Sequence, residues 1–109
     1  MNALIENKRP AICSLCQRYR VERLELFGSG TRPDFDPRSS DLDFLVEFSV
    51  PLLEEAADRY FGLLEGLEAL FQCPVDLVTL RSIRNPYFLK AIRPSRVLLY
   101  EAGKQKATV

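Results

Sequence analysis

Asp41 and Asp43 are separated by one residue and lead into the apolar run of residues 44–46. On a β-strand this spacing places both side chains on the same face, with their Cα atoms roughly 6.5 Å apart. Asp is disfavoured in strands, and two like charges on one face repel each other unless a positive charge lies between them. Carboxylate oxygens are ligands that hard divalent cations prefer. The pair therefore predicts a metal site carried on a rigid strand.

A glycine and a serine, Gly28 and Ser29, follow an apolar run that ends at Phe27. Glycine lets backbone N–H groups approach an anion closely, and the start of a helical turn adds a positive dipole end. Ser29 adds a hydroxyl donor. A phosphate cradle beside two metal-binding carboxylates fits nucleotidyl transfer, because metals neutralise charge on the attacking and leaving oxygens of an in-line displacement at phosphorus.

A third carboxylate, Asp76, lies inside the apolar run of residues 75–80, which we predict to be a strand. An aspartate within an apolar strand is costly unless it is paired with a cation or bound to a metal. A salt bridge to a nearby arginine is the structural alternative. Because Asp41 and Asp43 are already present, we interpret Asp76 as a further ligand of the same metal site.

Two other patterns have simpler explanations. Cys13 and Cys16 form a C-x-x-C pattern, but a zinc site needs four ligands, and the chain has only Cys73 besides them and no histidine. Because this pattern also precedes the first strand, we expect the cysteines to pack in the core. Asp34 and Asp36 repeat the D-x-D spacing between prolines, and we interpret them as solvated loop acids.

The remaining periodicity predicts an α/β (α+β) domain, a small sheet with helices packed on one face. One helix begins at Pro10, and a long helix runs from Pro51 to about Phe71 with a core stripe that includes Ala56 and Ala57. A short helix begins at Pro86 after Asn85 as its N-cap. The expected strands are residues 21–27, 42–48, 75–80 and 97–100.

The 109 residues predict one domain over residues 1–109, with residues 102–109 fraying at its end. Three cysteines are an odd number and give no disulfide framework. No stretch approaches the ~20 apolar residues of a membrane span. The N-terminus lacks a signal-peptide pattern, so we expect a cytoplasmic protein without membrane contact.

Charge is balanced over the chain but unevenly distributed. The formal net charge of zero gives no general affinity for nucleic acid, and no direct nucleic-acid contact is expected. Residues 1–80 hold 8 Lys/Arg and 14 Asp/Glu, whereas residues 81–109 hold 7 Lys/Arg and one acid. A basic C-terminal part beside an acidic site suits a triphosphate or an acidic partner, and a solvated basic face is the alternative.

The pattern from Gly28 and Ser29 to Asp41 and Asp43 resembles the signature of the DNA polymerase β-like nucleotidyltransferase superfamily. The short chain resembles its minimal nucleotidyltransferase (MNT) branch, whose members are often the antitoxins of HEPN–MNT toxin–antitoxin pairs. The family commonly reads Gly-Ser-x-Ala-Arg-Gly. Here Arg32 matches as well, whereas Thr31 replaces the alanine and a proline replaces the final glycine.

The resemblance implies a mixed sheet with the carboxylates on neighbouring strands. It also implies transfer of AMP from ATP to a hydroxyl group, a tyrosine of a partner HEPN ribonuclease, whose RNA site the added AMP would block. Asp41 and Asp43 would hold two Mg²⁺ ions, for which Mn²⁺ can substitute. Asp76 would complete the catalytic metal site and help to deprotonate the acceptor.

The same resemblance implies that the Gly28 N–H group and Ser29 hold the β- and γ-phosphates, and that Arg32 contacts a phosphate or the acceptor. The expected assembly is a hetero-oligomer with the toxin. Two rivals stay open: an antitoxin with a weak or inactive site that neutralises its partner by binding alone, and transfer to a small molecule. Enzymes of the second kind usually carry a further acceptor domain, for which 109 residues leave no room.

Overall fold

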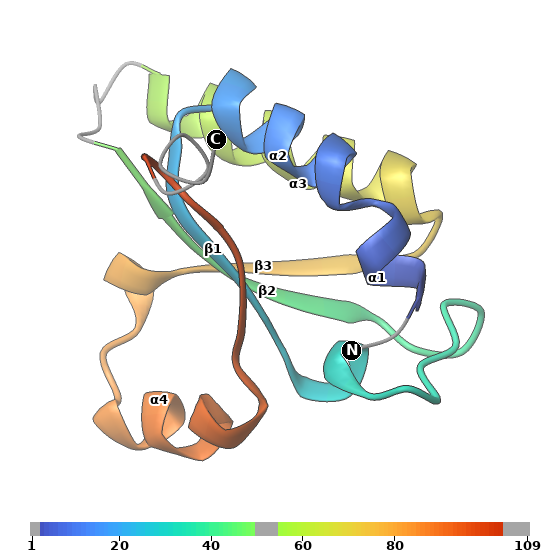
Figure 1. Ribbon diagram of the computed structural model, residues 1–109. Coiled ribbons are helices and arrows are strands. Elements are labelled where there is room, and N and C mark those ends of the chain that lie inside the picture. The colour runs from blue at the N-terminus through green and yellow to red at the C-terminus, as the bar shows by residue number, and fades with distance from the viewer. Residues whose placement is uncertain (1–2, 50–54, 104–109) are drawn as a thin grey trace.

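The computed structural model describes residues 3–49 and 55–103. Within them, the strands form one mixed sheet in the order β3-β2-β1-β4 (Figure 1). β1 runs antiparallel to β2 and β4, whereas β2 and β3 are parallel. The predicted strands are confirmed to within one residue. They are β1 (Val21–Phe27), β2 (Leu42–Phe48), β3 (Val75–Thr79) and β4 (Val97–Glu101).

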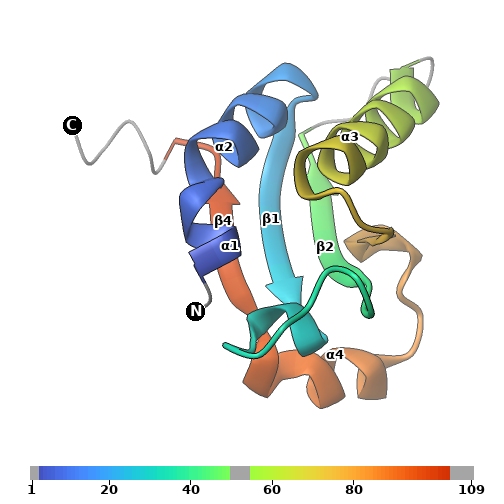
Figure 2. The ribbon, with the colours of Figure 1, turned by 90° about the vertical axis from the view of Figure 1, so that its right-hand side faces the viewer.

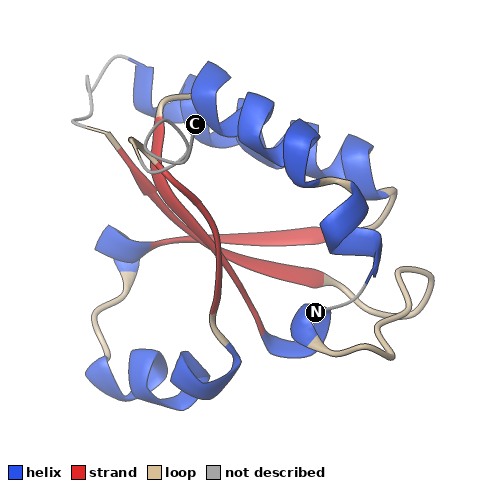
Figure 3. Ribbon diagram, in the orientation of Figure 1, coloured by secondary structure: helices blue, strands red, loops and turns tan. Residues whose placement is uncertain are grey.

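The helices lie on both sides of this sheet. α1 (Ala3–Asn7), α2 (Arg9–Arg18) and α3 (Ala56–Phe71) cover one face (Figures 1 and 2). α4 (Pro86–Ile92) lies beyond the opposite face (Figure 3). The predicted small mixed sheet with a helical layer on one face is confirmed, and α4 adds a cover on the other side. None of the helices in the described part of the chain is long and apolar enough to cross a membrane.

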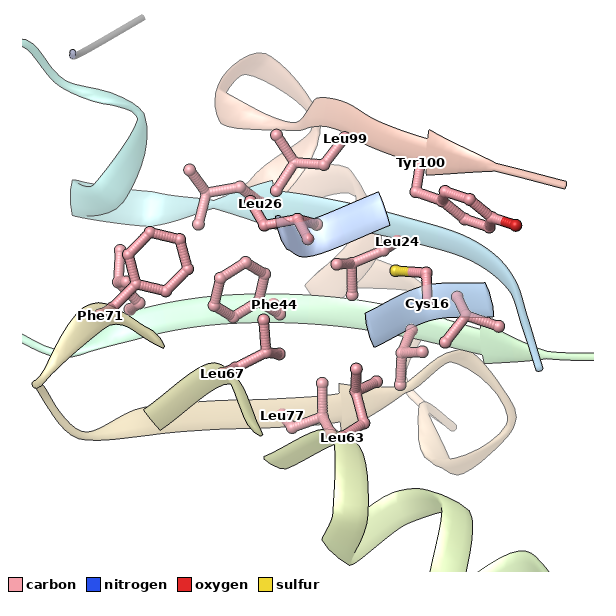
Figure 4. Packing of buried hydrophobic residues seen from close by; sticks show 14 of the residues in the cluster. Cys16, Leu24, Leu26, Phe44, Leu63, Leu67, Phe71, Leu77, Leu99 and Tyr100 are labelled. Atoms are coloured by element: carbon pink, nitrogen blue, oxygen red, sulfur yellow. The ribbon is translucent and has the colours of Figure 1, made fainter. Parts of the chain in front are cut away.

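Side chains from the sheet and from α3 meet in one apolar core (Figure 4). Leu24, Leu26 and Phe44 point from β1 and β2 towards Leu63 and Leu67 of α3, and all five are fully buried. Since successive side chains of a strand point to opposite faces, the residues between them face away from the helical layer. The core therefore fixes which strand residues are available for chemistry.

Two glycines of α3 allow α2 to approach closely. A Cβ atom on Gly62 would lie 2.3 Å from Cε1 of Tyr19, and one on Gly66 would lie 2.6 Å from Cδ2 of Leu15. Real Cβ contacts are not this short, so a side chain at either position would force the Tyr19 or Leu15 side chain to move. These glycines lower helix propensity but permit the close packing that covers the sheet.

The long helix differs from the prediction in its first part. Its predicted start at Pro51 lies outside the described residues, and α3 begins at Ala56. Ala56 and Ala57 are exposed, so their assignment to the core stripe was wrong. Arg59 is buried instead, where it donates to the Ser49 carbonyl group. A periodicity count does not show such a partner, because the partner lies on another element.

The predictions for the short helix and the loop are confirmed. The Asn85 side chain accepts a hydrogen bond of 2.9 Å from the Tyr87 N–H group and caps α4. In the loop, Asp34 is exposed. The Arg38 N–H group donates to Asp36 and lowers the pKa of that carboxyl group. Asp36 therefore closes a local turn.

The cysteines are free thiols, as expected. Cys16 is fully buried in the core cluster, Cys73 is buried, and Cys13 is half-buried. Burial, together with the neighbouring Cys13, raises the pKa of Cys16 to about 12. A thiol with such a pKa stays protonated at neutral pH and behaves as a small apolar side chain.

Candidate active site

The parallel pairing of β2 and β3 brings two of the predicted carboxylates together. Asp43 and Asp76 are partners in the strand register. The next pair in that register, Phe44 and Leu77, is buried in the core. Because side chains alternate along each strand, both aspartates point away from the helical layer and lie side by side. The sheet thus places them without help from a flexible loop.

The glycine turn lies against the first of these aspartates. A 3₁₀ turn, η1 (Gly28–Thr31), begins directly after β1, whose last residue Phe27 is the register partner of Asp43. Gly28 has a φ of +72°, and a Cβ atom there would lie 2.9 Å from Oδ2 of Asp43. Both facts favour glycine at this position. The predicted cradle and the predicted metal ligand therefore meet.

The site carries uncompensated negative charge. Burial raises the pKa of Asp43, and the charges of Asp76 and Asp41 raise it further. No ion pair within residues 3–49 and 55–103 involves any of these three aspartates. The salt bridge considered for Asp76 is thus not found. The charges of Asp76 and Asp41 act on Asp43, and none of the ion pairs among the described residues reaches this group of carboxylates.

The three aspartates differ in position. Asp43 is half-buried, Asp76 is exposed, and Asp41 is exposed in the loop just before β2. As the side chains stand, the described residues contain no group of three or more Asp, Glu, Cys or His that could hold a metal ion. The donor set still fits a hard divalent cation, because it consists of carboxylate oxygens whose repulsion a cation would relieve. Of the three aspartates, Asp43 and Asp76 are carried by paired strands, whereas Asp41 lies in the loop before β2.

One of the groups predicted to bind phosphate, the Gly28 N–H group, already has a partner within the chain. The Gly28 N–H group donates a hydrogen bond of 3.1 Å to Oγ of Ser95, so a contact with phosphate would require this bond to be exchanged. The Gly28 carbonyl group accepts a bond of 2.8 Å from the Thr31 hydroxyl group. Ser29 is half-buried in the turn, and Arg32 is exposed directly after it. Their predicted contacts with phosphates remain predictions.

A second group of charges lies on the same sheet face. Glu25 of β1 accepts bonds of 2.9 and 2.6 Å from the Arg96 guanidinium and one of 3.2 Å from Arg23. Arg23 also pairs with Glu101 of β4. Burial alone would raise the pKa of Glu25, but the two arginines outweigh burial and lower it. This cluster compensates its own charges.

Ser95 and Arg96 did not emerge from the sequence as site residues. Ser95 lies 67 residues beyond Gly28, and a single serine carries no motif. The segment that contains it, η4 (Arg93–Ser95), follows α4 directly. Only the folded sheet brings this segment against the glycine turn.

A hollow of about 220 Å³ lies elsewhere, where α3 begins near the ends of β2 and β3. Arg59, Tyr60 and Thr79 are among the residues that line it. None of the predicted site residues contributes to it, so the carboxylate site and this hollow are separate.

The fold and the site together define a protein of the nucleotidyltransferase class. A family model described as "Nucleotidyltransferase domain" matches residues 11–99. The chain therefore belongs to the nucleotidyltransferase domain family. The predicted enzyme class and the resemblance to minimal nucleotidyltransferases are confirmed.

Relatives and solved structures agree with this assignment. A protein of Methanocaldococcus jannaschii named "Putative protein adenylyltransferase" is 40% identical over 81 residues, which are 72% of this chain and 76% of the relative. A solved structure described as a "putative minimal nucleotidyltransferase" matches with a TM-score of 0.71 and 28% identity, over 89% of this chain and 95% of that one.

A third similarity concerns the fold alone. It is to a solved structure of a tri-AMPylated Shewanella oneidensis HEPN toxin in complex with an MNT antitoxin. The TM-score is 0.62 at 19% identity, and the match covers 95% of this chain and 78% of that one. The match shows that this chain has the fold found in that complex.

Proposed function

We propose that this protein transfers AMP from ATP to a hydroxyl group of a partner protein, and that it thereby acts as the antitoxin of a HEPN-type toxin. The observation that carries the proposal is the contact between Gly28 and Asp43 beside the in-register neighbour Asp76. A turn that can approach phosphates and a pair of carboxylates on adjacent strands are the two parts that this reaction needs.

The metal site would consist of Asp41, Asp43 and Asp76, with Mg²⁺ as the ion and Mn²⁺ as a substitute. The raised pKa of Asp43 supports this assignment, since burial and then the charges of Asp76 and Asp41 disfavour its carboxylate, and a bound cation would offset these effects. When bound, Mg²⁺ supplies neutralisation of the charge on the attacking and leaving oxygens. Asp43 and Asp76 contribute fixed positions, because both are carried by paired strands.

The other groups orient the substrates. Ser29 and Arg32 would bind the β- and γ-phosphates beside Asp43. Asp76, whose side chain is exposed, would accept the proton of the acceptor hydroxyl group. The acceptor oxygen forms a bond to the α-phosphorus, the bond from that phosphorus to its bridging oxygen breaks, and pyrophosphate leaves.

Two findings support adenylyl transfer to a protein. The M. jannaschii relative is named for that activity, and its match covers most of both chains. The fold is also shared with an MNT antitoxin that was solved with a tri-AMPylated HEPN toxin. We expect the acceptor to be a tyrosine hydroxyl group of the toxin, the assembly to be a hetero-oligomer, and the location to be the cytoplasm, where ATP and the toxin's RNA are found.

The alternative is an antitoxin that neutralises its partner by binding alone. One observation favours it: the Gly28 N–H group, which would otherwise contact a phosphate, is already bonded to Ser95. The two possibilities differ in one measurable property. An enzyme needs the Asp76 carboxylate, whereas a steric inhibitor needs only its surface.

The decisive experiment incubates a candidate HEPN partner protein with ATP, Mg²⁺ and either the wild type or Asp76→Asn. Intact-mass measurement of the HEPN protein should show AMP increments with the wild type. The rate with Asp76→Asn should be lower by a factor of ~10² or more. The exposed loop variant Asp34→Asn is the matched control and should retain transfer. If the wild type adds no mass and still neutralises the toxin, binding alone is the function.

A further inference from the structure

The hydroxyl group of Ser95 both accepts and donates a hydrogen bond. Its Oγ accepts a hydrogen bond of 3.1 Å from the Gly28 N–H group and donates one of 3.0 Å to the Ile92 carbonyl group. The side chain is half-buried. The bond to Ile92 orients the hydroxyl group, so that its lone pair faces Gly28. Ser95 is therefore a fixed acceptor and not a rotating surface hydroxyl group.

Both backbone polar groups of Gly28, its N–H and its carbonyl group, are hydrogen-bonded. Ser95 binds its N–H group, and the Thr31 hydroxyl group binds its carbonyl group at 2.8 Å. Its φ of +72° and its contact with Asp43 leave little freedom for the turn to shift. The direction of the backbone from Gly28 to Ser29, and with it the position of the Ser29 side chain, depends on this conformation.

The segment that carries Ser95 is itself anchored to β1. Arg96 makes its two hydrogen bonds with the buried Glu25. Phe88 of α4 packs edge-to-face on Phe27, with ring centroids 6.0 Å apart. These contacts lie on either side of Ser95 in the chain. The serine thus approaches Gly28 from a rigid support.

We propose that Ser95 is a positioning residue for nucleotide binding, which holds Gly28 so that the turn presents Ser29 to the phosphates beside Asp43. The inference rests on the proposed function. The family resemblance implied that the Gly28 N–H group contacts a phosphate. In this proposal the group instead fixes the turn. The α4–η4 segment thereby becomes part of the nucleotide site.

The chain offers a matched control for this hydrogen bond. Ser82 ends the 3₁₀ turn η3 (Leu80–Ser82) and donates to the carbonyl group three residues earlier at 2.8 Å, as Ser95 does at 3.0 Å. Ser82→Ala therefore removes the same local bond without touching Gly28. Ser95→Thr keeps the hydroxyl group, since threonine can also bond the carbonyl group of the preceding turn. Ser95→Ala removes it.

The first measurement is amide hydrogen exchange of Gly28 by NMR, which needs neither a nucleotide nor a partner. In Ser95→Ala the exchange should be faster by a factor of roughly five or more, while Ser95→Thr and Ser82→Ala should match the wild type. Equal exchange in wild type and Ser95→Ala would overturn the inference.

The second measurement is calorimetry with AMP-PNP and Mg²⁺. Ser95→Ala should bind roughly two- to tenfold more weakly, whereas Ser95→Thr and Ser82→Ala should keep the wild-type affinity. Tighter binding by Ser95→Ala would show that the hydroxyl group competes with the nucleotide, and would overturn the positioning role.

The two measurements separate this inference from the proposed function. If the wild type binds no AMP-PNP while its Gly28 amide is protected by Ser95, the proposed function fails and the contact stands. If the wild type binds AMP-PNP and the Gly28 amide is unprotected, only the positioning role fails.

Discussion

Two carboxylates on the same face of the sheet, Glu25 and Asp43, have opposite electrostatic surroundings. Glu25 accepts hydrogen bonds from two arginines, and its pKa lies below the ordinary value even though burial opposes this. The pKa of Asp43 lies above its ordinary value because burial and the charges of Asp76 and Asp41 act in the same direction. The chain supplies arginines to one carboxylate and further carboxylates to the other.

The difference separates a structural charge from a functional one. Glu25 of β1 accepts hydrogen bonds from Arg96, the residue just before β4. These bonds stabilise the sheet face next to η4. Asp43 makes no ion pair within the described residues, so its charge costs stability until an external cation arrives. A cluster without ion pairs among the described residues is where binding of an external charge gains most.

The largest expected effect follows from removing the charge of Asp43. Asp43→Asn should lower the rate of AMP transfer by ~10² or more, because one fixed ligand of the metal site is lost. The free energy of unfolding should stay the same or rise, since the repulsion from Asp76 disappears. Intact-mass kinetics and urea unfolding measure the two quantities. A folded variant with unchanged transfer would remove Asp43 from the site.

The second-largest effect concerns Glu25, the carboxylate whose charge is paired with arginines. Glu25→Gln should lower the free energy of unfolding by about 2 kcal/mol, because Arg96 and Arg23 lose a charged acceptor in a partly buried place. Glu65→Gln, an exposed position on α3, should change it by less than about 0.5 kcal/mol. Urea unfolding of both variants tests the difference. Equal stabilities would show that the Glu25 cluster contributes little.

The two carboxylates should also respond to pH with opposite signs. A raised pKa means that stability is present below the ordinary value of 3.8 and is lost as pH rises through the folded-state pKa of Asp43. The advantage of Asp43→Asn over wild type should therefore shrink on acidification.

For Glu25 the pKa is lowered, so its stabilisation is present above the ordinary value of 4.5 and is lost as pH falls through the folded-state pKa. Glu25→Gln should be less stable than the wild type at neutral pH, and this deficit in the free energy of unfolding should also shrink on acidification. The two variants therefore approach the stability of the wild type from opposite sides. Urea midpoints of wild type and both variants between neutral pH and about pH 3 measure these trends. Differences of the same sign for both variants would contradict the assignment of their neighbours.

Patterns among neighbouring residues were sufficient to predict the strands and the aspartate pair of the site. Alternation of apolar residues, with glycine and proline at the ends, defines β1 and β2 because these signals lie within a few neighbouring residues. The spacing of Asp41 and Asp43 likewise shows what chemistry is available. Asp76 was interpreted as a further ligand because it lies in an apolar strand, and the family resemblance implied neighbouring strands. The register of β2 and β3 now places Asp76 beside Asp43.

The contacts that complete the site were not predictable in this way. The hydrogen bond between Gly28 and Ser95 and the ion pair between Glu25 and Arg96 join segments far apart in the chain. Neither residue pair has a periodic or motif signal, because the contacts depend on how α4 and η4 return to β1. Helix α1 was missed as well, since its 5 residues are too few to show a period.

The smallest expected effect lies on the other face of the sheet, away from both carboxylates. Cys16 is fully buried, and burial with Cys13 raises its pKa to about 12, so the protonated thiol acts as an apolar group. Cys16→Ala should cost about 1 kcal/mol of unfolding free energy, and the half-buried Cys13→Ala less. AMP transfer should be unchanged in both, because the helical layer contributes no side chain to the proposed metal site. Metal analysis and intact-mass kinetics of the double variant provide the test. Bound zinc in the wild type, or lost transfer in a folded variant, would show that the cysteines belong to the chemistry, and the separation of the two sheet faces would then be wrong.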